Sequence, residues 1–399
     1  METIPIVDYA DILHGNKQKF LKDLHFALSE IGFMVLVNYP GLEDSFQKKM
    51  FKKVRQFFNA PKEVKQTADI RNNPYFRGWS KKVGGNNGFG QVIEAFQYAF
   101  ESEPICEPDD ENVHVYKRLF RGPNAWPDTK FDGMEDFRDS IHELTGVYHK
   151  LTHDLGHLIC ECLGEDPSEF DKYFDFKDPD LAASLNHNFS MHDIPEEKRP
   201  KILKEFKKAK SNITGAHIDG PPFVALLIND RPGLEVVTTQ GNWIAAPVTC
   251  QTVNYGVNYP VPIIPNSVIV NSGGTLMHLS KGRIGATLHR VNTSLIPYGE
   301  DRVSMPFFLL PKMDGPLIPF GMTYEEARQR QKEGHTGYEL DRDRGTNAAV
   351  NRMGTFPQTT KRWWKKEFKL LRRQHLKEVA AETQAAYDLA NARGKKARL

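Results

Sequence analysis

The amino-acid sequence predicts a mainly β fold with helices packed around it. Short apolar segments bounded by turn residues follow one another between residues 216 and 308, which is typical of antiparallel strands. Apolar residues recur at helical spacing in residues 17–31 and 43–58. A longer amphipathic pattern covers residues 133–163 and ends at Gly164, a candidate C-cap. N-terminal helices and a long central helix therefore flank a β-rich core.

The other elements before residue 262 follow from the same signals. Alternating or continuous apolar segments predict strands at residues 4–8, 33–38, 94–100, 223–228 and 234–238, and another beginning at Trp243. Residues 74–79 and the Gly/Asn-rich segment 84–90 predict loops. Residues 196–210 form a charged insert. Residues 249–262 predict an elaborated loop, and long loops in compact domains often act as functional lids.

The last part of the chain has a different character. It predicts a short helix at 324–333, a polar glycine-containing segment at 334–356, and a long helix at 360–392 that includes Trp363 and Trp364. A basic helix with tryptophans can bind nucleic acid or a membrane surface. Because its charges are mixed, packing on the core or on a second subunit is favoured. The predicted divisions are residues 1–130 (N-terminal αβ region), 131–312 (catalytic β core with its long helix) and 313–399 (C-terminal helical extension).

Composition excludes several classes of protein. The 399 residues carry a formal charge of only +2, so no general polyanion partner is implied. The sequence lacks an apolar run of about eighteen residues and the features of a signal peptide. Its four cysteines do not form a disulfide framework. We therefore expect a soluble cytoplasmic protein that acts on a small molecule, without nucleic-acid or membrane partners, and a homodimer through the C-terminal helix as one alternative.

Three residues have the chemistry of an iron site. His217 and Asp219 are separated by one residue, so both side chains leave an extended strand on the same face. His289 lies far along the chain, but it is reachable if the intervening strands fold back into a closed sheet. Two imidazoles and one carboxylate form the facial triad of non-haem Fe(II) oxygenases, whose open positions take a co-substrate and O₂.

Arg302 and Ser304 follow this site on a predicted strand. Strand alternation places their side chains on one face. An arginine holds a carboxylate through two parallel N–H donors, and a serine hydroxyl can donate a third hydrogen bond. A metal site together with such a carboxylate clamp predicts an oxygenase that uses a 2-oxo acid.

These motifs resemble the 2-oxoglutarate/Fe(II)-dependent dioxygenase superfamily, in the branch that includes isopenicillin N synthase. The resemblance also rests on segments similar to further family motifs, namely Ile4–Asp8, Gly32–Asn38, Pro265–Asn271 and Thr287–Val291. It runs from about residue 4 to residue 310 and leaves the C-terminal extension uncovered. It implies a double-stranded β-helix, or jelly roll, supported by the N-terminal helices and the long central helix.

The resemblance also implies the co-substrates. Fe(II) would be bound by the triad, and 2-oxoglutarate by Arg302 and Ser304, while an unactivated C–H bond is oxidised with release of succinate and CO₂. Residues 181–189 resemble the strand that carries, in many relatives, a tyrosine that helps bind the far carboxylate. Asn188 takes the place of that tyrosine here, with an amide donor. Gly274 stands where relatives often have Asp. The sequence leaves open whether the outcome is hydroxylation, desaturation, ring formation or rearrangement.

Three other functions are weighed beside this one. An oxidase similar to isopenicillin N synthase would use the arginine and serine to bind its substrate and need no 2-oxo acid, and Asn188 leaves that reading open. A non-catalytic metal-binding or interaction protein is disfavoured because all five site residues are intact. A zinc hydrolase is disfavoured because no neighbouring general base is evident and the arginine and serine would have no role.

The substrate is predicted to be a small to mid-sized organic molecule, as in secondary metabolism. Phe96, Phe223 and Phe308 are the candidates for substrate contact, although aromatic residues such as Phe96 are more often core residues. A second histidine pattern, at positions 149, 153 and 157, has a spacing that can bind metal. A polar stripe beside an apolar helix face is the favoured reading of that pattern.

Overall fold

Two β-sheets form the centre of the computed structural model, which describes residues 3–83, 92–189, 214–252, 261–296, 299–336 and 338–369. The strands are β1 (Ile6–Asp8), β2 (Phe33–Val37), β3 (Gly78–Val83), β4 (Val92–Tyr98), β5 (Asp180–Phe189), β6 (Thr214–His217), β7 (Val224–Asn229), β8 (Leu234–Val237), β9 (Trp243–Ala245), β10 (Ser267–Ser272), β11 (His289–Val291) and β12 (Asp301–Leu310). The larger sheet has eight strands in the order β1-β2-β10-β7-β12-β5-β4-β3, and the smaller has four in the order β6-β11-β8-β9.

The two sheets pack face to face over an apolar core. Phe33, Val35 and Ile269 of the larger sheet belong to one buried cluster with Leu234 and Val236 of the smaller sheet. The pairing of β1 with β2 is parallel, and the other pairs between the described strands are antiparallel. This arrangement is the jelly roll that the sequence predicts, with additional strands extending the larger sheet.

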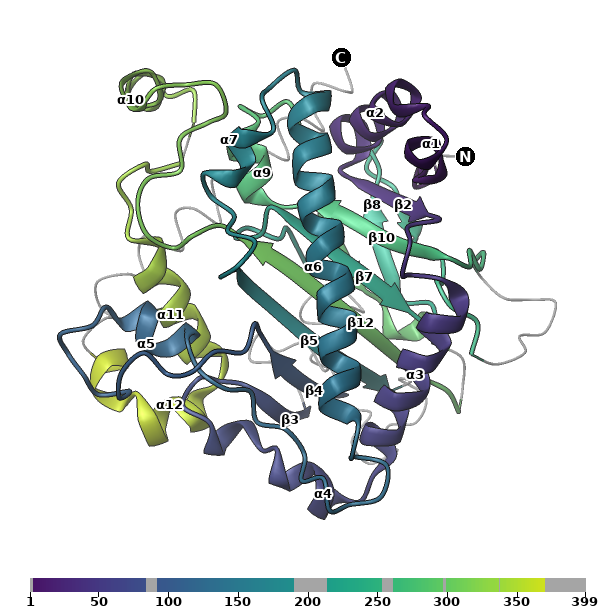
Figure 1. Ribbon diagram of the computed structural model, residues 1–399, viewed down its shortest axis with the longest axis vertical. Helices are drawn as coiled ribbons and strands as arrows, with labels where there is room; N and C mark the ends of the chain where they lie inside the picture. Colours follow the sequence, from purple (N-terminus) through teal and green to yellow (C-terminus); the bar gives the residue numbers. More distant parts are fainter. Residues whose placement is uncertain are drawn as a thin grey trace.

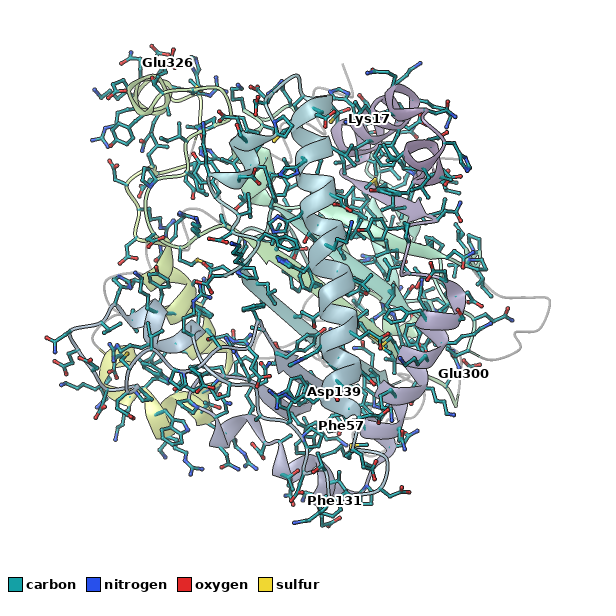
Figure 2. All side chains as sticks on the ribbon, in the orientation of Figure 1. Lys17, Phe57, Phe131, Asp139, Glu300 and Glu326 are labelled. Atoms are coloured by element: carbon teal, nitrogen blue, oxygen red, sulfur yellow. The ribbon has the colours of Figure 1, made fainter. Side chains whose placement is uncertain are left out.

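Helices cover the outer face of the larger sheet (Figure 1). The described helices are α1 (Ala10–Leu13), α2 (Lys17–Phe26), α3 (Asp44–Asn59), α4 (Lys62–Thr67), α5 (Val115–Phe120), α6 (Phe137–Cys162), α7 (Ser168–Asp171), α9 (Gly274–Leu279), α10 (Tyr324–Lys332), α11 (Arg344–Thr355) and α12 (Pro357–Trp363). The long helix α6 crosses the sheet, where the Tyr148 hydroxyl donates to the Met305 carbonyl at 3.2 Å. Figure 2 shows Phe57 of α3 near the end of α6 that carries Asp139, and the ring of Phe57 stacks on Phe137 with centroids 4.8 Å apart. None of the described helices is long and apolar enough to cross a bilayer.

Strand alternation gives the larger sheet a second, partly open face. On β12, Val303 and Met305 are buried on the side of the helices, whereas Pro306 and Phe308 are half-buried on the opposite side. The side that carries Arg302, Ser304, Pro306 and Phe308 is called the inner face below, because it turns toward the smaller sheet. Antiparallel register extends the inner face to Asn188 on β5, the cross-strand partner of Arg302.

Most predicted elements are present, and the differences have local reasons. The helix predicted at 17–31 is α2 followed by a π-helical turn, Ala27–Ile31, that ends at Gly32 with a positive φ of 74°. Residues 78–83, predicted within a loop region, form strand β3 because they pair with β4. The polar segment 334–356 contains helix α11. Its buried side chains include Thr346 and Asn347 as well as apolar residues, so they form no continuous apolar stripe that would predict a helix.

The described part of the C-terminal extension packs on the N-terminal region. Helices α11 and α12 contribute to a buried cluster that consists of Ile70, Phe76, Val115, Leu119, Ala349, Met353, Phe356 and Trp364. The indole of Trp364 is fully buried and donates to the Pro74 carbonyl at 2.7 Å. The charged insert 196–210, most of the predicted 249–262 loop and the predicted helix beyond residue 369 lie outside the described residues.

Candidate active site

The three predicted metal ligands meet at the edge of the smaller sheet. His217 ends β6 and His289 begins β11, and the register makes them direct cross-strand partners with ring centroids 4.4 Å apart. The carboxylate of Asp219 lies 3.6 Å from Nε2 of each histidine. The ligand atoms of all three residues lie within 4.8 Å of one another.

Hydrogen bonds fix the orientation of two of these side chains. Asn271 on β10 donates from Nδ2 to Oδ2 of Asp219 at 3.0 Å. Nδ1 of His289 lies 3.0 Å from the Thr287 carbonyl, which only accepts hydrogen bonds. Nδ1 therefore carries the proton, and Nε2 presents its lone pair toward Asp219.

Burial and charge suit this site to a divalent metal. Burial lowers the pKa of His289 despite the opposing attraction of Asp219, which favours the neutral imidazole that a metal requires. The His217 side chain is 49% exposed, whereas His289 is buried, so the site opens on the His217 side. Two neutral nitrogen donors and one carboxylate with an open side fit Fe(II) and leave coordination positions for other ligands.

The three residues predicted to bind 2-oxoglutarate lie together on the inner face. Arg302 and Ser304 are 1% and 2% exposed, and Nη1 of Arg302 donates to Oγ of Ser304 at 2.9 Å. Nε of Arg302 donates to the Arg231 carbonyl at 3.2 Å, which holds the side chain against the β7–β8 turn. Asn188 is also buried and stands opposite Arg302 on β5.

A buried charge network behind β12 was not predicted from the sequence. Arg55 of α3 donates from Nε and Nη2 to Oδ2 of Asp230 at 2.8 and 2.6 Å, and it also pairs with Asp301. Oδ1 of Asp230 accepts from the backbone N–H of Val303 at 2.9 Å. Since Val303 lies between Arg302 and Ser304, this network positions the strand that carries both.

His187 joins the same network from β5. Its Nε2 pairs with Asp301, and its Nδ1 lies 3.5 Å from Glu94. Burial opposes a charge on His187, but the neighbouring carboxylates of Asp301 and Glu94 outweigh it and raise the pKa of the imidazole. No local pattern indicates this role, because His187 reads as an ordinary polar residue until the register places it beside two carboxylates.

The predicted substrate phenylalanines separate into two groups. Phe308 is half-buried on the inner face, in register with Ala225 on β7 and Asn271 on β10. Phe96 is fully buried on the outer side, with its ring 5.5 Å from that of Phe57. Phe223 is fully buried and packs against the stacked rings of Phe170 and Phe174. The prediction of substrate contact is therefore wrong for Phe96 and Phe223, which are core residues.

The helical histidines do not form a metal site. His149 bonds through Nε2 to the Phe176 carbonyl at 2.9 Å, and His157 pairs with Asp171 at 2.8 Å. Within the described ranges, the one group of three or more metal-binding side chains is His217, Asp219 and His289.

Comparison with known families agrees with this geometry. Residues 4–129 match the N-terminal domain of non-haem dioxygenases, described from morphine synthesis, and residues 253–311 match the 2OG-Fe(II) oxygenase superfamily. The chain belongs to the 2-oxoglutarate/Fe(II)-dependent dioxygenase superfamily. The enzyme is accordingly an oxidoreductase whose cofactor is Fe(II) and whose co-substrate is 2-oxoglutarate.

Similar proteins include several fungal dioxygenases. The dioxygenase is 27% identical to a 2-oxoglutarate-dependent dioxygenase of Monascus ruber over 341 residues, covering 83% of this chain and 93% of that protein. It is 26% identical to the clavatol oxidase of Penicillium crustosum, covering 82% of this chain and 91% of the relative. The crystal structure of a full-length Neurospora crassa protein in complex with alpha-KG superposes with a TM-score of 0.65 at 22% identity, covering 88% of this chain and 96% of that chain, and supports the fold.

Proposed function

We propose that the dioxygenase oxidises an unactivated C–H bond of a small to mid-sized organic molecule of secondary metabolism. The observation that carries this proposal is the His217–Asp219–His289 triad on the smaller sheet together with the buried Arg302–Ser304 pair on the inner face of the larger sheet, which turns toward it. The fungal dioxygenases to which the chain is similar support a metabolite substrate.

The residues have separate tasks in this proposal. His217, Asp219 and His289 hold Fe(II), while Arg302, Ser304 and the Asn188 amide hold the far carboxylate of 2-oxoglutarate. When bound, Fe(II), 2-oxoglutarate and O₂ supply the oxidation and yield succinate and CO₂. Phe308 offers an apolar contact for the substrate beside Asp219, since it shares an inner-face row with Asn271. The buried clamp excludes water from the co-substrate carboxylate.

The test is anaerobic addition of Fe(II) and then 2-oxoglutarate, followed by visible absorption. A weak charge-transfer band is expected when a 2-oxo acid chelates the iron. Arg302→Ala should require a much higher 2-oxoglutarate concentration for the band, whereas Arg328→Ala on the exposed helix α10 should not. Iron binding without a band would favour the oxidase reading, and a protein that binds no iron would leave the non-catalytic or zinc readings.

Two further predictions belong with this proposal. A cytoplasmic location rests on the sequence features described above. A homodimer through the C-terminal helix rests on residues beyond 369, which the structure does not describe. Light scattering of the full chain beside a chain ending at residue 369 would test the dimer, because only the longer protein should associate.

A further inference from the structure

The C-terminal extension brings an arginine to the inner face of the larger sheet. Nη1 of Arg352 on α11 donates to Oε1 of Gln97 on β4 at 3.3 Å, and its Nη2 donates to the Phe76 carbonyl at 2.8 Å. The register pairs Gln97 with Ser184 on β5, and Ser184 aligns with Pro306 rather than with the outward-facing residues of β12. Gln97 is half-buried and lies on the same face of the sheet as Ser304 and Phe308.

Among the described residues, no carboxylate pairs with the guanidinium of Arg352. In the part of the chain that the structure describes, its hydrogen-bond acceptors are an amide and a main-chain carbonyl, and no ion pair involves it. Desolvation lowers the pKa of Arg352 to about 10, which still leaves the guanidinium charged at neutral pH. A desolvated cation without a counter-ion is unfavourable, so an anion that reached it would be stabilised.

A second guanidinium lies close enough to add to this positive potential. Burial, and then repulsion from Arg352 and Arg121, lower the pKa of Arg77 to about 9. Arg77 donates to the main-chain carbonyls of Phe100 and Gly122. Arg121 differs from the other two, because it pairs with Asp180 at 3.1 Å.

A hollow adjoins this cluster at the end of the inner face. It is small, with a volume of about 10 Å³ that suits about one water molecule, and it is lined by Arg77, Ala99, Arg121, Asp180, Leu310 and Met313, among other residues. Ala99 follows Gln97 by two positions, and Leu310 follows Phe308 by two, so the hollow continues the inner face beyond both residues. The positively charged cluster therefore lies at the end of the inner face.

We propose that Arg352 binds a carboxylate of the organic substrate and thereby selects carboxylic acids over their neutral analogues. Arg352 contacts strand β4, whereas Asp219 is held by Asn271 on β10. Strands β7, β12 and β5 lie between β10 and β4, so these two strands are about 19 Å apart at ~4.8 Å per strand spacing. The acid group consequently lies at the opposite end of a mid-sized substrate from the carbon that is oxidised. This inference rests on the proposed function for its substrate, and the binding site itself can be tested without turnover.

The test measures binding of matched acids and primary amides, with decanoic acid and phenylhexanoic acid as probes, by titration calorimetry. The full chain is kept anaerobic with Fe(II) and saturating 2-oxoglutarate, so that the co-substrate already occupies Arg302. The acids should bind more tightly than their amides, and Arg352→Gln should reduce that preference by about tenfold or more. Gln97→Glu places a carboxylate beside Arg352 without removing it, and it should reduce the preference in the same way.

Arg362→Gln is the matched control, because Arg362 lies in the same extension but donates to Asn72 on the surface. It should keep the full acid preference. The proposal is overturned if no acid binds, if the amides bind as tightly as the acids, or if both Arg352→Gln and Gln97→Glu retain the preference. Failure of the proposed function has a different signature, namely no charge-transfer band with 2-oxoglutarate, and acid binding can still be measured in that case.

Discussion

The side-chain amide of Asn271 donates a hydrogen bond to the carboxylate of Asp219 at 3.0 Å and so ties the larger sheet to the metal site on the smaller one. Asn271 lies on β10, which pairs with both β2 and β7 at the centre of the larger sheet. The position of Asp219 therefore depends on the packing of the two sheets as well as on the loop that follows β6.

Replacing Asn271 by alanine should weaken iron binding without removing a ligand. Loss of a hydrogen bond to a metal-ligating carboxylate typically reduces metal affinity by about 10–100-fold. Competition with a chromophoric chelator measures the Fe(II) affinity directly. Asp219→Ala should reduce both iron binding and turnover to background, since it removes the only anionic ligand. Asn351→Ala, an exposed amide on α11, is the control and should bind iron normally.

The Arg55–Asp230 pair should contribute strongly to stability. Asp230 is fully buried, and Arg55→Gln removes its closer cationic partner and leaves Arg231 at 3.7 Å, so the free energy of unfolding should fall by about 3 kcal/mol. Urea unfolding measures this change. The exposed pair Lys49–Glu143 has a similar separation of 2.7 Å, and Lys49→Gln should change the stability by less than about 1 kcal/mol. Equal effects of the two substitutions would contradict a buried structural role for Arg55.

The same network should make stability depend on pH through His187. Because its pKa is raised in the folded state, the protonated imidazole stabilises the fold below the unfolded pKa of about 6.5, and this contribution is lost as pH rises through the folded pKa. The loss cannot exceed about 1.4 kcal/mol per pH unit for one group. Unfolding free energies measured from pH 6 upward should therefore decline less steeply in His187→Gln than in the wild type.

Asp301 contributes at the acidic end with the opposite sign. Burial would raise its pKa, but His187 and Arg55 outweigh this effect and hold the pKa well below its usual range. Its stabilisation is present above the unfolded pKa of about 3.9 and is lost as pH falls through the folded value. For the measurement on His187→Gln, the control is His25→Gln, which replaces an exposed histidine on α2. If His187→Gln kept the slope of the wild type, His187 would not be the responsible group.

Sequence patterns identified the triad because ligand chemistry depends on residue type and on strand alternation, which are both local. Phe308 lies on the inner face of the larger sheet and Phe96 on the face that packs against the helices. Which face a residue occupies depends on the pairing of the strands, and the sequence of a single strand does not reveal which of its faces meets the helices. The charge network around Asp230 and the contacts of Arg352 are harder to predict from the sequence. They join α3 to β12 and α11 to β4 across more than two hundred residues, so each partner appears ordinary in its own segment.

The final prediction concerns Gly274, whose backbone N–H donates to the Asp219 carbonyl at 2.7 Å. A Cβ at Gly274 would lie 2.6 Å from the Gly220 carbonyl oxygen, so Gly274→Ala must displace the loop that carries Asp219. We expect Fe(II) affinity to fall by about 10–100-fold. Gly354→Ala is the control, because a Cβ there meets nothing within 4 Å, and it should stabilise α11 by about 0.5–1 kcal/mol. Normal iron affinity in Gly274→Ala would show that the triad tolerates movement of this loop.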